Sequence, residues 1–296
     1  MKPSDILQSH GIMMVLGLVL GIVVGGFPAM TREISMAALA LLMTVSLANV
    51  KLTETKGRGL PREAAVTLLL NYGFLTIVIL LLGGLFSEKL WWGWVLMAAA
   101  PSAISIVPFT NILGGSVPKA LFSTSVNYLA ALVLMPLICL AFIGSAVSVI
   151  SLVTSLLLLI VLPMILSRGV KRIGTQKRTR TLVTNLSFFV LIFAVAGSNR
   201  DAFLDDSIMV LAVSAACLIR TFGTGFLAEV ILRKARVPKQ DRIHWVLFSG
   251  YKNLGLTATL AIALFEPIVA VPATICIMFE VIWIITMTKY YPKVPD

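Results

Sequence analysis

Four ionisable side chains lie inside long apolar segments of this chain, and each needs a physical reason to be there. They are Arg220, Glu229, Lys252 and Glu280. A charge at the centre of a membrane helix costs roughly 2.5–3.5 kcal/mol on insertion scales, so such residues pair, bind an ion or line a water-filled cavity. The four residues therefore indicate buried ion pairs, a site for charged solutes, or both.

Lys252 is the hardest of the four to explain by a role at the membrane surface. It lies in "WVLFSGYKNLGLTATL", residues 245–260, between Gly250 and Gly255. A helix that begins at Ile243 would place it about 14 Å deep, too far for a lysine stem to reach water easily. The glycines weaken a helix, so this stretch predicts unwound backbone around a buried cation.

The other three residues have simpler explanations. Glu229 is near the end of its segment, and Arg233 follows at the i+4 spacing of a favourable helical ion pair. Arg220 and Glu280 lie at similar depths in their segments, so we expect them to pair, either for stability or beside a substrate. Lys252 would then remain uncompensated, and it needs an anion, water or the negative ends of helix dipoles.

Uncharged polar residues gather near Lys252 and near a second interruption of the apolar pattern. Serine and threonine in membrane helices usually hydrogen-bond their own backbone, whereas asparagine amides need other partners in lipid. His10 and His244 fall at predicted interfaces, which argues against a metal site, and no cofactor motif is present. The candidate substrate contacts are Asn253, Ser249, Thr110, Asn111, Asn71, Thr124 and Asn127.

The composition places most of the chain in lipid. Of its 296 residues, 58% are hydrophobic and only 12% are charged, about half the charged fraction of a soluble domain. A spanning helix needs about 20 apolar residues. Ten segments qualify, at 6–27, 34–50, 64–85, 91–113, 120–143, 148–167, 181–198, 207–232, 243–265 and 267–288.

Basic residues between the segments set the predicted orientation. The loops 51–62, 168–180 and 233–242 carry four, six and five of them. With ten spans, Lys2, Lys119, Lys289 and Lys293 join the same side, and the other side keeps Arg32, Lys89 and Arg200. The positive-inside rule then predicts a multi-pass protein of the cell (cytoplasmic) membrane with both termini cytoplasmic. Because the net charge of +11 is spread over these loops, it does not indicate nucleic-acid binding.

The chain reads as one all-α transporter domain, 1–296, made of two inverted five-helix repeats at about 6–143 and 148–288. In each half the fourth span is interrupted: Pro101 and Pro108 fall within one, and "SGYKNLG" falls within the other. Paired interrupted helices at matching positions are the best sequence indication of a transporter site. We therefore expect helices 4 and 9 to be broken.

These motifs resemble those of the bile acid:sodium symporter family over nearly the whole chain. "MAAAPSAISIVPFTNILGGSVPKAL" is similar to the family's span 4, and "GYKNLGL" to its span 9 signature, Glu-x-Gly-x-Gln-Asn-x-Gly-Leu. The resemblance implies ten spans in inverted repeats, broken helices 4 and 9 that cross, and transport of small organic anions. We expect the substrate to bind between this crossing and spans 1, 2, 6 and 7. The matching residues are Pro101 and Gly115 in span 4, and Gly250, Asn253, Gly255 and Leu256 in span 9.

The chain departs from the family at the positions that bind sodium, so the resemblance does not extend to sodium coupling. The lost hydroxyl, amide and carboxylate oxygens were the ligands a hard cation prefers. An ammonium carries the same charge with three donors, so we expect Lys252 to take the place of sodium beside the unwound backbone. Ile106, Val107, Ala120, Phe248 and Lys252 occupy sodium-ligand positions, whereas Thr124 is kept and Asn71 replaces a glutamine.

The sequence therefore predicts a secondary carrier or facilitator of small organic anions that works by alternating access without sodium. A lysine that loses its proton on burial could also exchange a proton, so a proton is a further candidate partner. The alternatives are a sodium-coupled organic anion symporter, a non-transporting membrane sensor or scaffold, and a direct substrate contact for Lys252. An enzyme is not expected, because no nucleophile–base pair or zinc motif lies at depth.

Overall fold

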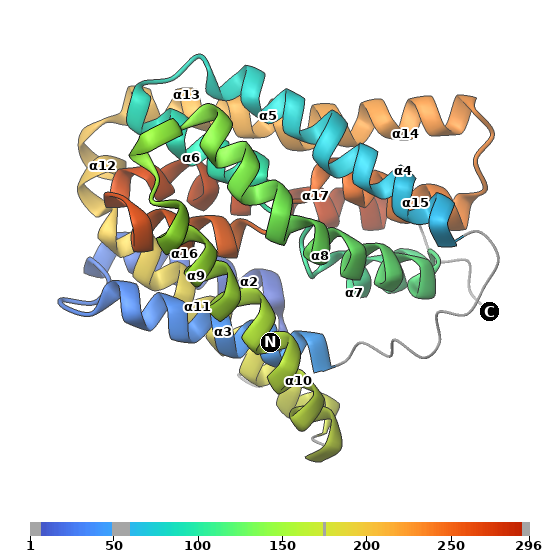
Figure 1. Ribbon diagram of the computed structural model, residues 1–296, viewed down its shortest axis with the longest axis horizontal. Helices are drawn as coiled ribbons and strands as arrows, with labels where there is room; N and C mark the ends of the chain where they lie inside the picture. The colour runs from blue at the N-terminus through green and yellow to red at the C-terminus, as the bar shows by residue number, and fades with distance from the viewer. Residues whose placement is uncertain (1–6, 49–59, 174–175, 292–296) are drawn as a thin grey trace.

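The computed structural model describes residues 7–48, 60–173 and 176–291, and this part of the chain is all-helical, without a named strand (Figure 1). The predicted all-α class is therefore confirmed. Lys2, Lys293 and most of the 51–62 loop lie outside the described residues. The first half of the chain forms α2 (His10–Val24), α3 (Thr31–Ala48), α4 (Leu60–Leu68), η2 (Leu69–Leu75), α5 (Thr76–Gly83), α6 (Glu88–Ala99), α7 (Ile106–Leu113), α8 (Val117–Phe142) and η3 (Gly144–Ala146).

The second half is helical in the same way, with short irregular joints. Its elements are α9 (Val149–Leu156), η4 (Leu157–Val161), α10 (Leu162–Ile173), α11 (Lys177–Ser198), α12 (Arg200–Asp205), α13 (Ser207–Leu218), η5 (Ile219–Gly223), α14 (Thr224–Lys234), α15 (Lys239–Gly250), α16 (Leu254–Leu264), η6 (Pro267–Ala270) and α17 (Val271–Tyr290).

Seven helices in the described residues are long and apolar enough to cross a membrane. They correspond to seven of the ten predicted segments, with ends that differ by a few residues. The three remaining segments contain shorter helices: α2 in the first, α6 and α7 in the fourth, and α15 and α16 in the ninth. The protein is thus a membrane protein in which two apolar segments are divided into half-helices.

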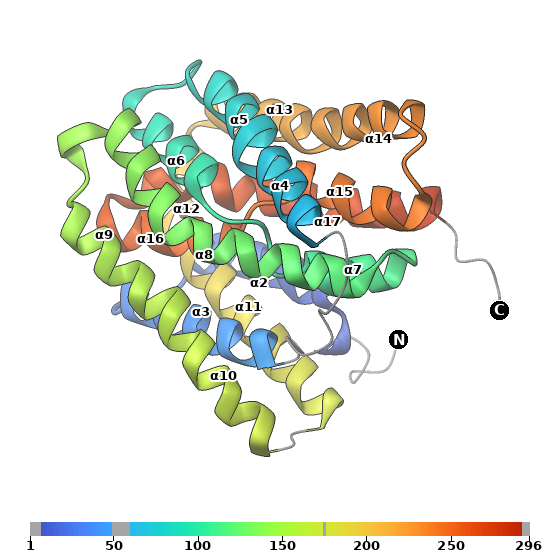
Figure 2. The same ribbon diagram turned by 45° about the vertical axis from the view of Figure 1, so that its right-hand side comes forward.

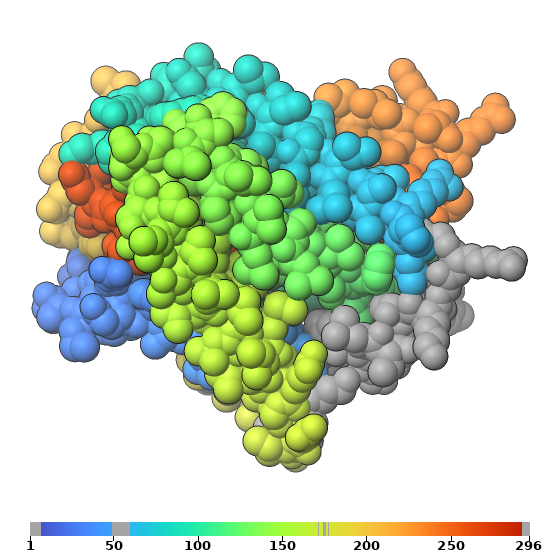
Figure 3. All heavy atoms as spheres, viewed as in Figure 1, coloured from blue at the N-terminus to red at the C-terminus, as the bar shows by residue number. Residues whose placement is uncertain are grey.

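The helices form two groups that meet along one side of the molecule. The first, here called the four-helix layer, contains α2, α3, α9–α10 and α11, with α11 packed on α2 and α3 and with α10 packed on α3. Figures 1 and 2 show this layer below the remaining helices, which we call the crossing bundle. Figure 3 shows α9–α10 as a yellow-green ridge down the front. The layer contacts the bundle mainly through α16.

The two divided segments pass each other inside the crossing bundle. Residues 100–105 separate α6 from α7, and residues 251–253 separate α15 from α16. The extended pieces form an antiparallel bridge between Ser102 and Lys252. The backbone N–H of Asn253 donates to the carbonyl of Pro101 at 2.8 Å. Four helix ends therefore meet in the interior, where water cannot satisfy their backbone groups.

Close helix contacts hold α6 in its place at this crossing. A Cβ added to Gly93 would lie 2.2 Å from the carbonyl oxygen of Val269 and 3.2 Å from the Pro272 ring. Since the nearest atom belongs to the backbone, a side chain can be accommodated only by moving η6 away from α6. The glycine lets the first half-helix approach closely enough for its end to reach the crossing.

We expect Gly93→Ala to lower the free energy of unfolding by about 1–3 kcal/mol, the usual range for overpacking a core. The measurement is the melting temperature of the detergent-purified protein. Gly169→Ala is the matched control, because an added Cβ there meets nothing within 4 Å and alanine favours a helix. Equal melting temperatures for the two variants would contradict the packing argument.

Candidate functional site

The ammonium of Lys252 lies against the carboxyl-terminal end of α6. Its Nζ donates to the carbonyl of Ala98 at 2.8 Å and to that of Ala100 at 2.9 Å. It also contacts Asn71 Oδ1 at 3.1 Å and Thr76 Oγ1 at 3.2 Å, and it lies 4.5 Å from the centre of the Tyr72 ring. With Lys252 fully buried, its three protons meet only protein acceptors. The cation therefore neutralises the negative end of a half-helix.

Asn71 does the same for the second half-helix. Its amide nitrogen donates to the carbonyl of Phe248 at 3.2 Å and to that of Tyr251 at 3.1 Å, at the end of α15. Its amide oxygen accepts from Lys252. A single network thus satisfies the carboxyl-terminal ends of α6 and α15. Asn71 comes from η2, a π-helical turn, and such turns are frequent at functional sites.

Arg220 and Glu280 form an ion pair behind the crossing. Arg220 Nη1 lies 2.7 Å from Glu280 Oε1, and the arginine is fully buried. The same carboxylate oxygen accepts the backbone amide of Lys252 at 3.1 Å, and the Tyr251 hydroxyl donates to the Glu280 carbonyl at 2.7 Å. Arg220 comes from a second π-helical turn, η5. Its Nε and Nη2 have no partner among the described residues, so Glu280 is essential to its charge balance.

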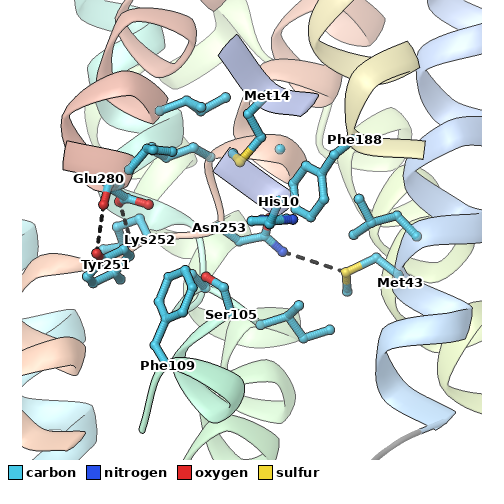
Figure 4. A pocket seen from close by; sticks show the side chains of 17 residues that line it. His10, Met14, Met43, Ser105, Phe109, Phe188, Tyr251, Lys252, Asn253 and Glu280 are labelled. Atoms are coloured by element: carbon cyan, nitrogen blue, oxygen red, sulfur yellow. Dashed lines mark hydrogen bonds between the residues drawn. The ribbon is translucent and has the colours of Figure 1, made fainter. Parts of the chain in front are cut away.

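A pocket of about 50 Å³ lies between the four-helix layer and the crossing bundle. The layer contributes mainly apolar walls, including Met14, Met43 and Phe188. Figure 4 shows Ser105, Asn253 and Glu280 on the bundle side. The pocket thus combines an apolar interior with a few polar groups at the helix breaks, as small-molecule sites commonly do.

Of the predicted site residues, Asn253, Lys252 and Glu280 line this pocket. The Asn253 amide donates to the Tyr128 hydroxyl at 2.6 Å, and its oxygen accepts from the Leu256 amide at 3.0 Å, which caps α16. Lys252 lines the pocket with its backbone, because its ammonium is hydrogen-bonded to the end of α6. Asn71 and Arg220 lie behind these residues rather than in the pocket.

The remaining predicted contacts do not line this pocket, so their role in substrate binding stays a prediction. The hydroxyls of Ser249, Thr110 and Thr124 donate to carbonyls of their own helices, at 2.7–2.8 Å. Asn127 does likewise, to Ser123 at 2.9 Å, and Asn111 is exposed on α7. Local backbone carbonyls therefore satisfy a donor of most of these side chains.

Sequence reasoning missed several residues that shape the site. His10 lines the pocket, and its Nδ1 lies 3.1 Å from Asn185 Oδ1. Thr76 and Tyr128 hold Lys252 and Asn253 through the hydrogen bonds given above. Tyr72 and Tyr128 directly follow Asn71 and Asn127 in the sequence, and a buried phenol hydroxyl also needs a partner. That adjacency was the one signal that could have found Tyr128.

A second polar cluster lies where α4, α8 and α15 begin. Glu63, Asp241 and His244 have ligand atoms within 4.8 Å of one another, a group that could hold a metal ion. However, Lys119 Nζ lies 3.0 Å from Glu63 and 2.7 Å from Asp241, and Trp245 donates to Glu63 at 2.8 Å. Lys119 already supplies the positive charge. His244, expected at an interface, is buried against Glu63.

Glu229 has a different partner from the one predicted. It pairs with Arg242 on α15 at 3.0 Å and accepts from the Tyr291 hydroxyl, whereas Arg233 donates to the Tyr290 hydroxyl. Burial and the contact with Glu229 both raise the pKa of Tyr291. Arg233 is the nearest arginine in sequence, but tertiary packing brings Arg242 closer to the Glu229 carboxylate.

Comparison with known proteins agrees with this architecture. The model of the SBF-like CPA transporter family (DUF4137) matches residues 12–290. The chain belongs to this family. The predicted resemblance to bile acid:sodium symporters is therefore confirmed, and membership places the chain among transporters rather than enzymes.

One curated relative is similar over part of its length. The chain is 28% identical over 193 residues to the "Uncharacterized sodium-dependent transporter YocS" of Bacillus subtilis (strain 168). The match covers 62% of this chain and 58% of the relative. The chain thus matches less than two thirds of that protein, whose printed description names sodium but no substrate.

We expect Lys252→Met to destabilise the protein strongly. The change keeps an unbranched side chain but leaves the carbonyl of Ala100 and the amide oxygen of Asn71 without the donor they have here, and each buried unsatisfied group costs about 1–3 kcal/mol. The measurement is the melting temperature in detergent. Lys234→Met, at an exposed position of α14, is the control. Similar small losses in both variants would show that the ammonium does not support the helix end.

We also expect Arg220→Gln and Glu280→Gln to destabilise more singly than together. Each single change leaves an uncompensated charge or unpaired donors in the interior, at a cost of about 3–5 kcal/mol. The double variant removes both charges. A double-mutant cycle of melting temperatures measures the coupling, and strictly additive losses would show that the pair contributes nothing.

Proposed function

We propose that this protein is a secondary carrier that moves small organic anions across the cell membrane by alternating access, with Lys252 as a fixed cation in place of sodium. The observation that carries the proposal is the coordination of the Lys252 ammonium. All four of its hydrogen-bond contacts are protein oxygens at 2.8–3.2 Å. No proton is left for a substrate, which favours the role of counter-cation over that of substrate anchor.

Charge and helix ends support an anionic substrate. The crossing contains two cations, Arg220 and Lys252, and one carboxylate, Glu280, so its formal charge is positive. The amino-terminal end of α7 also faces the pocket, because Ser105 lines it, and Ser105 makes no capping bond with its side chain. The positive end of the α7 dipole favours an anion there.

The arrangement of the breaks supports the inverted repeat and the alternating-access mechanism. The half-helix pairs α6/α7 and α15/α16 each follow a span interrupted by a π-helical turn, η2 in one case and η5 in the other. We take the ten segments to be spans, with the three loops rich in basic residues and both termini in the cytoplasm. The pocket lies between the two helix groups, where relative movement would expose it to alternate sides.

The second candidate is a sodium-coupled anion symporter, favoured by the printed description of the Bacillus relative as sodium-dependent. Against it stand the apolar residues at the family's sodium positions. Ile106, Ala120 and Phe248 are all fully buried here, and their side chains offer no oxygen. Uptake measurements with controlled ion gradients separate the two candidates.

We expect purified wild-type protein in proteoliposomes to take up at least one of radiolabelled pyruvate, succinate, malate and gluconate, at a rate that does not change with a sodium gradient. Lys252→Gln removes the fixed charge while keeping hydrogen bonding, so added sodium should partly restore its uptake. Lys234→Gln controls for the loss of an exposed lysine.

Two results would contradict this function. Wild-type uptake that rises steeply with a sodium gradient would favour the symporter. Failure of all four compounds to enter or exchange would remove the carrier of small carboxylates and favour a non-transporting role.

A further inference from the structure

The Glu280 carboxylate has one oxygen turned toward the protein and one toward the pocket. Oε1 receives both the Arg220 guanidinium and the Lys252 amide. Oε2 has no hydrogen-bond partner among the described residues, and Figure 4 shows it directed into the pocket. The side chain is 10% exposed. A buried carboxylate therefore presents a single free acceptor to whatever enters the pocket.

Glu280 is the one charged group of the described pocket lining whose polar end is free. The ammonium of Lys252 donates to the end of α6, and the hydroxyl of Tyr251 donates to the backbone carbonyl of Glu280. His10, across the pocket on α2, has its Nδ1 at Asn185. The other titratable or charged groups around Glu280 are Arg220 from η5, Cys217 from α13 and Cys276 on α17.

This geometry sets opposing electrostatic conditions for the two occupants of the pocket. An anion beside the ionised Oε2 is repelled by it. A proton on Oε2 removes that repulsion and supplies an O–H donor, but alone it leaves Arg220 and Lys252 without a compensating charge. When the proton and the anion are bound together, the anion is not repelled by Glu280 and its charge compensates Arg220 and Lys252. Each ligand therefore increases the affinity for the other, by the reciprocity of linked binding.

We propose that Glu280 is the proton-binding site of a proton–anion symporter. The inference rests on the proposed function and assigns its coupling ion. A proton from water on one side forms an O–H bond at Oε2 and converts the carboxylate to the neutral acid. The anion binds next to it, the pocket opens to the other side, and the O–H bond breaks as the proton returns to water there. One proton therefore moves with each anion carried.

The test uses proteoliposomes containing the whole protein and the four radiolabelled carboxylates named above. With an alkaline interior, the wild type should accumulate a transported compound above its external concentration. Glu280→Gln mimics the neutral acid permanently, so it should still exchange internal for external compound but lose accumulation driven by the pH gradient. The control is Glu266→Gln, since Glu266 is an exposed carboxylate paired with Lys89 and should accumulate like the wild type.

The outcomes separate this inference from the proposed function. Accumulation by Glu280→Gln equal to that of the wild type would overturn the inference while leaving the carrier intact. If Glu280→Gln does not fold, the Arg220→Gln/Glu280→Gln double variant takes its place, since it removes both charges of the pair; it should show exchange without accumulation.

A second measurement holds even if none of the four compounds is transported. Infrared difference spectra between acid and alkaline pH should contain a protonated-carboxyl band in the wild type and in Glu266→Gln that is missing from Glu280→Gln. Absence of that band from the wild type would overturn the proton site, and its presence without any transport would refute the proposed function alone.

Discussion

The main constraint on this structure is the need to satisfy helix ends that lie in an apolar interior. Dividing two spans creates four such ends, and each has backbone groups without partners in their own helix. At the carboxyl-terminal ends, one ammonium and one amide complete the hydrogen bonding: Lys252 at α6 and Asn71 at α15. Because these side chains also contact each other, neither half-helix can move far without disturbing the other.

The same network extends to the buried ion pair. The backbone amide of Lys252 donates to the carboxylate of Glu280, which pairs with Arg220. Asn71 and Arg220 each come from a π-helical turn, where the extra residue changes the direction of the following side chains. The two spans that contain those turns, Leu60–Gly83 and Ser207–Lys234, are long enough to cross a membrane, and each turn directs a polar group at the crossing. Local irregularity in the spans thus supports the irregular backbone between them.

Much of this arrangement follows from residue type and depth. A lysine too deep to reach water, beside two glycines, required nearby acceptors, and Arg220 and Glu280 at matched depths required each other; the structure places that pair 2.7 Å apart. The predicted hydroxyl contacts lie outside the pocket lining, and a carbonyl one turn away competes for the proton of a serine or threonine. Residue spacing along one helix carries no information on how separate helices pack. It could therefore predict neither the pairing of Glu229 with Arg242 nor the position of His10.

A fixed cation has a consequence for energy coupling that follows from its attachment to the chain. A bound sodium ion enters from one side and leaves on the other, so its gradient performs work on the carrier. In the proposed carrier, the Lys252 ammonium supplies the same charge to the helix end but stays attached to the chain, so it favours no direction of transport. Any coupling must then lie in a group that exchanges with the pocket contents. Among the charged residues described at the crossing, Glu280 alone has a free polar atom that faces the pocket, because the unpaired nitrogens of Arg220 lie behind it. In the proposed carrier, a tethered cation in place of an exchangeable ion therefore moves the coupling from the break in α15–α16 to the carboxylate beside it.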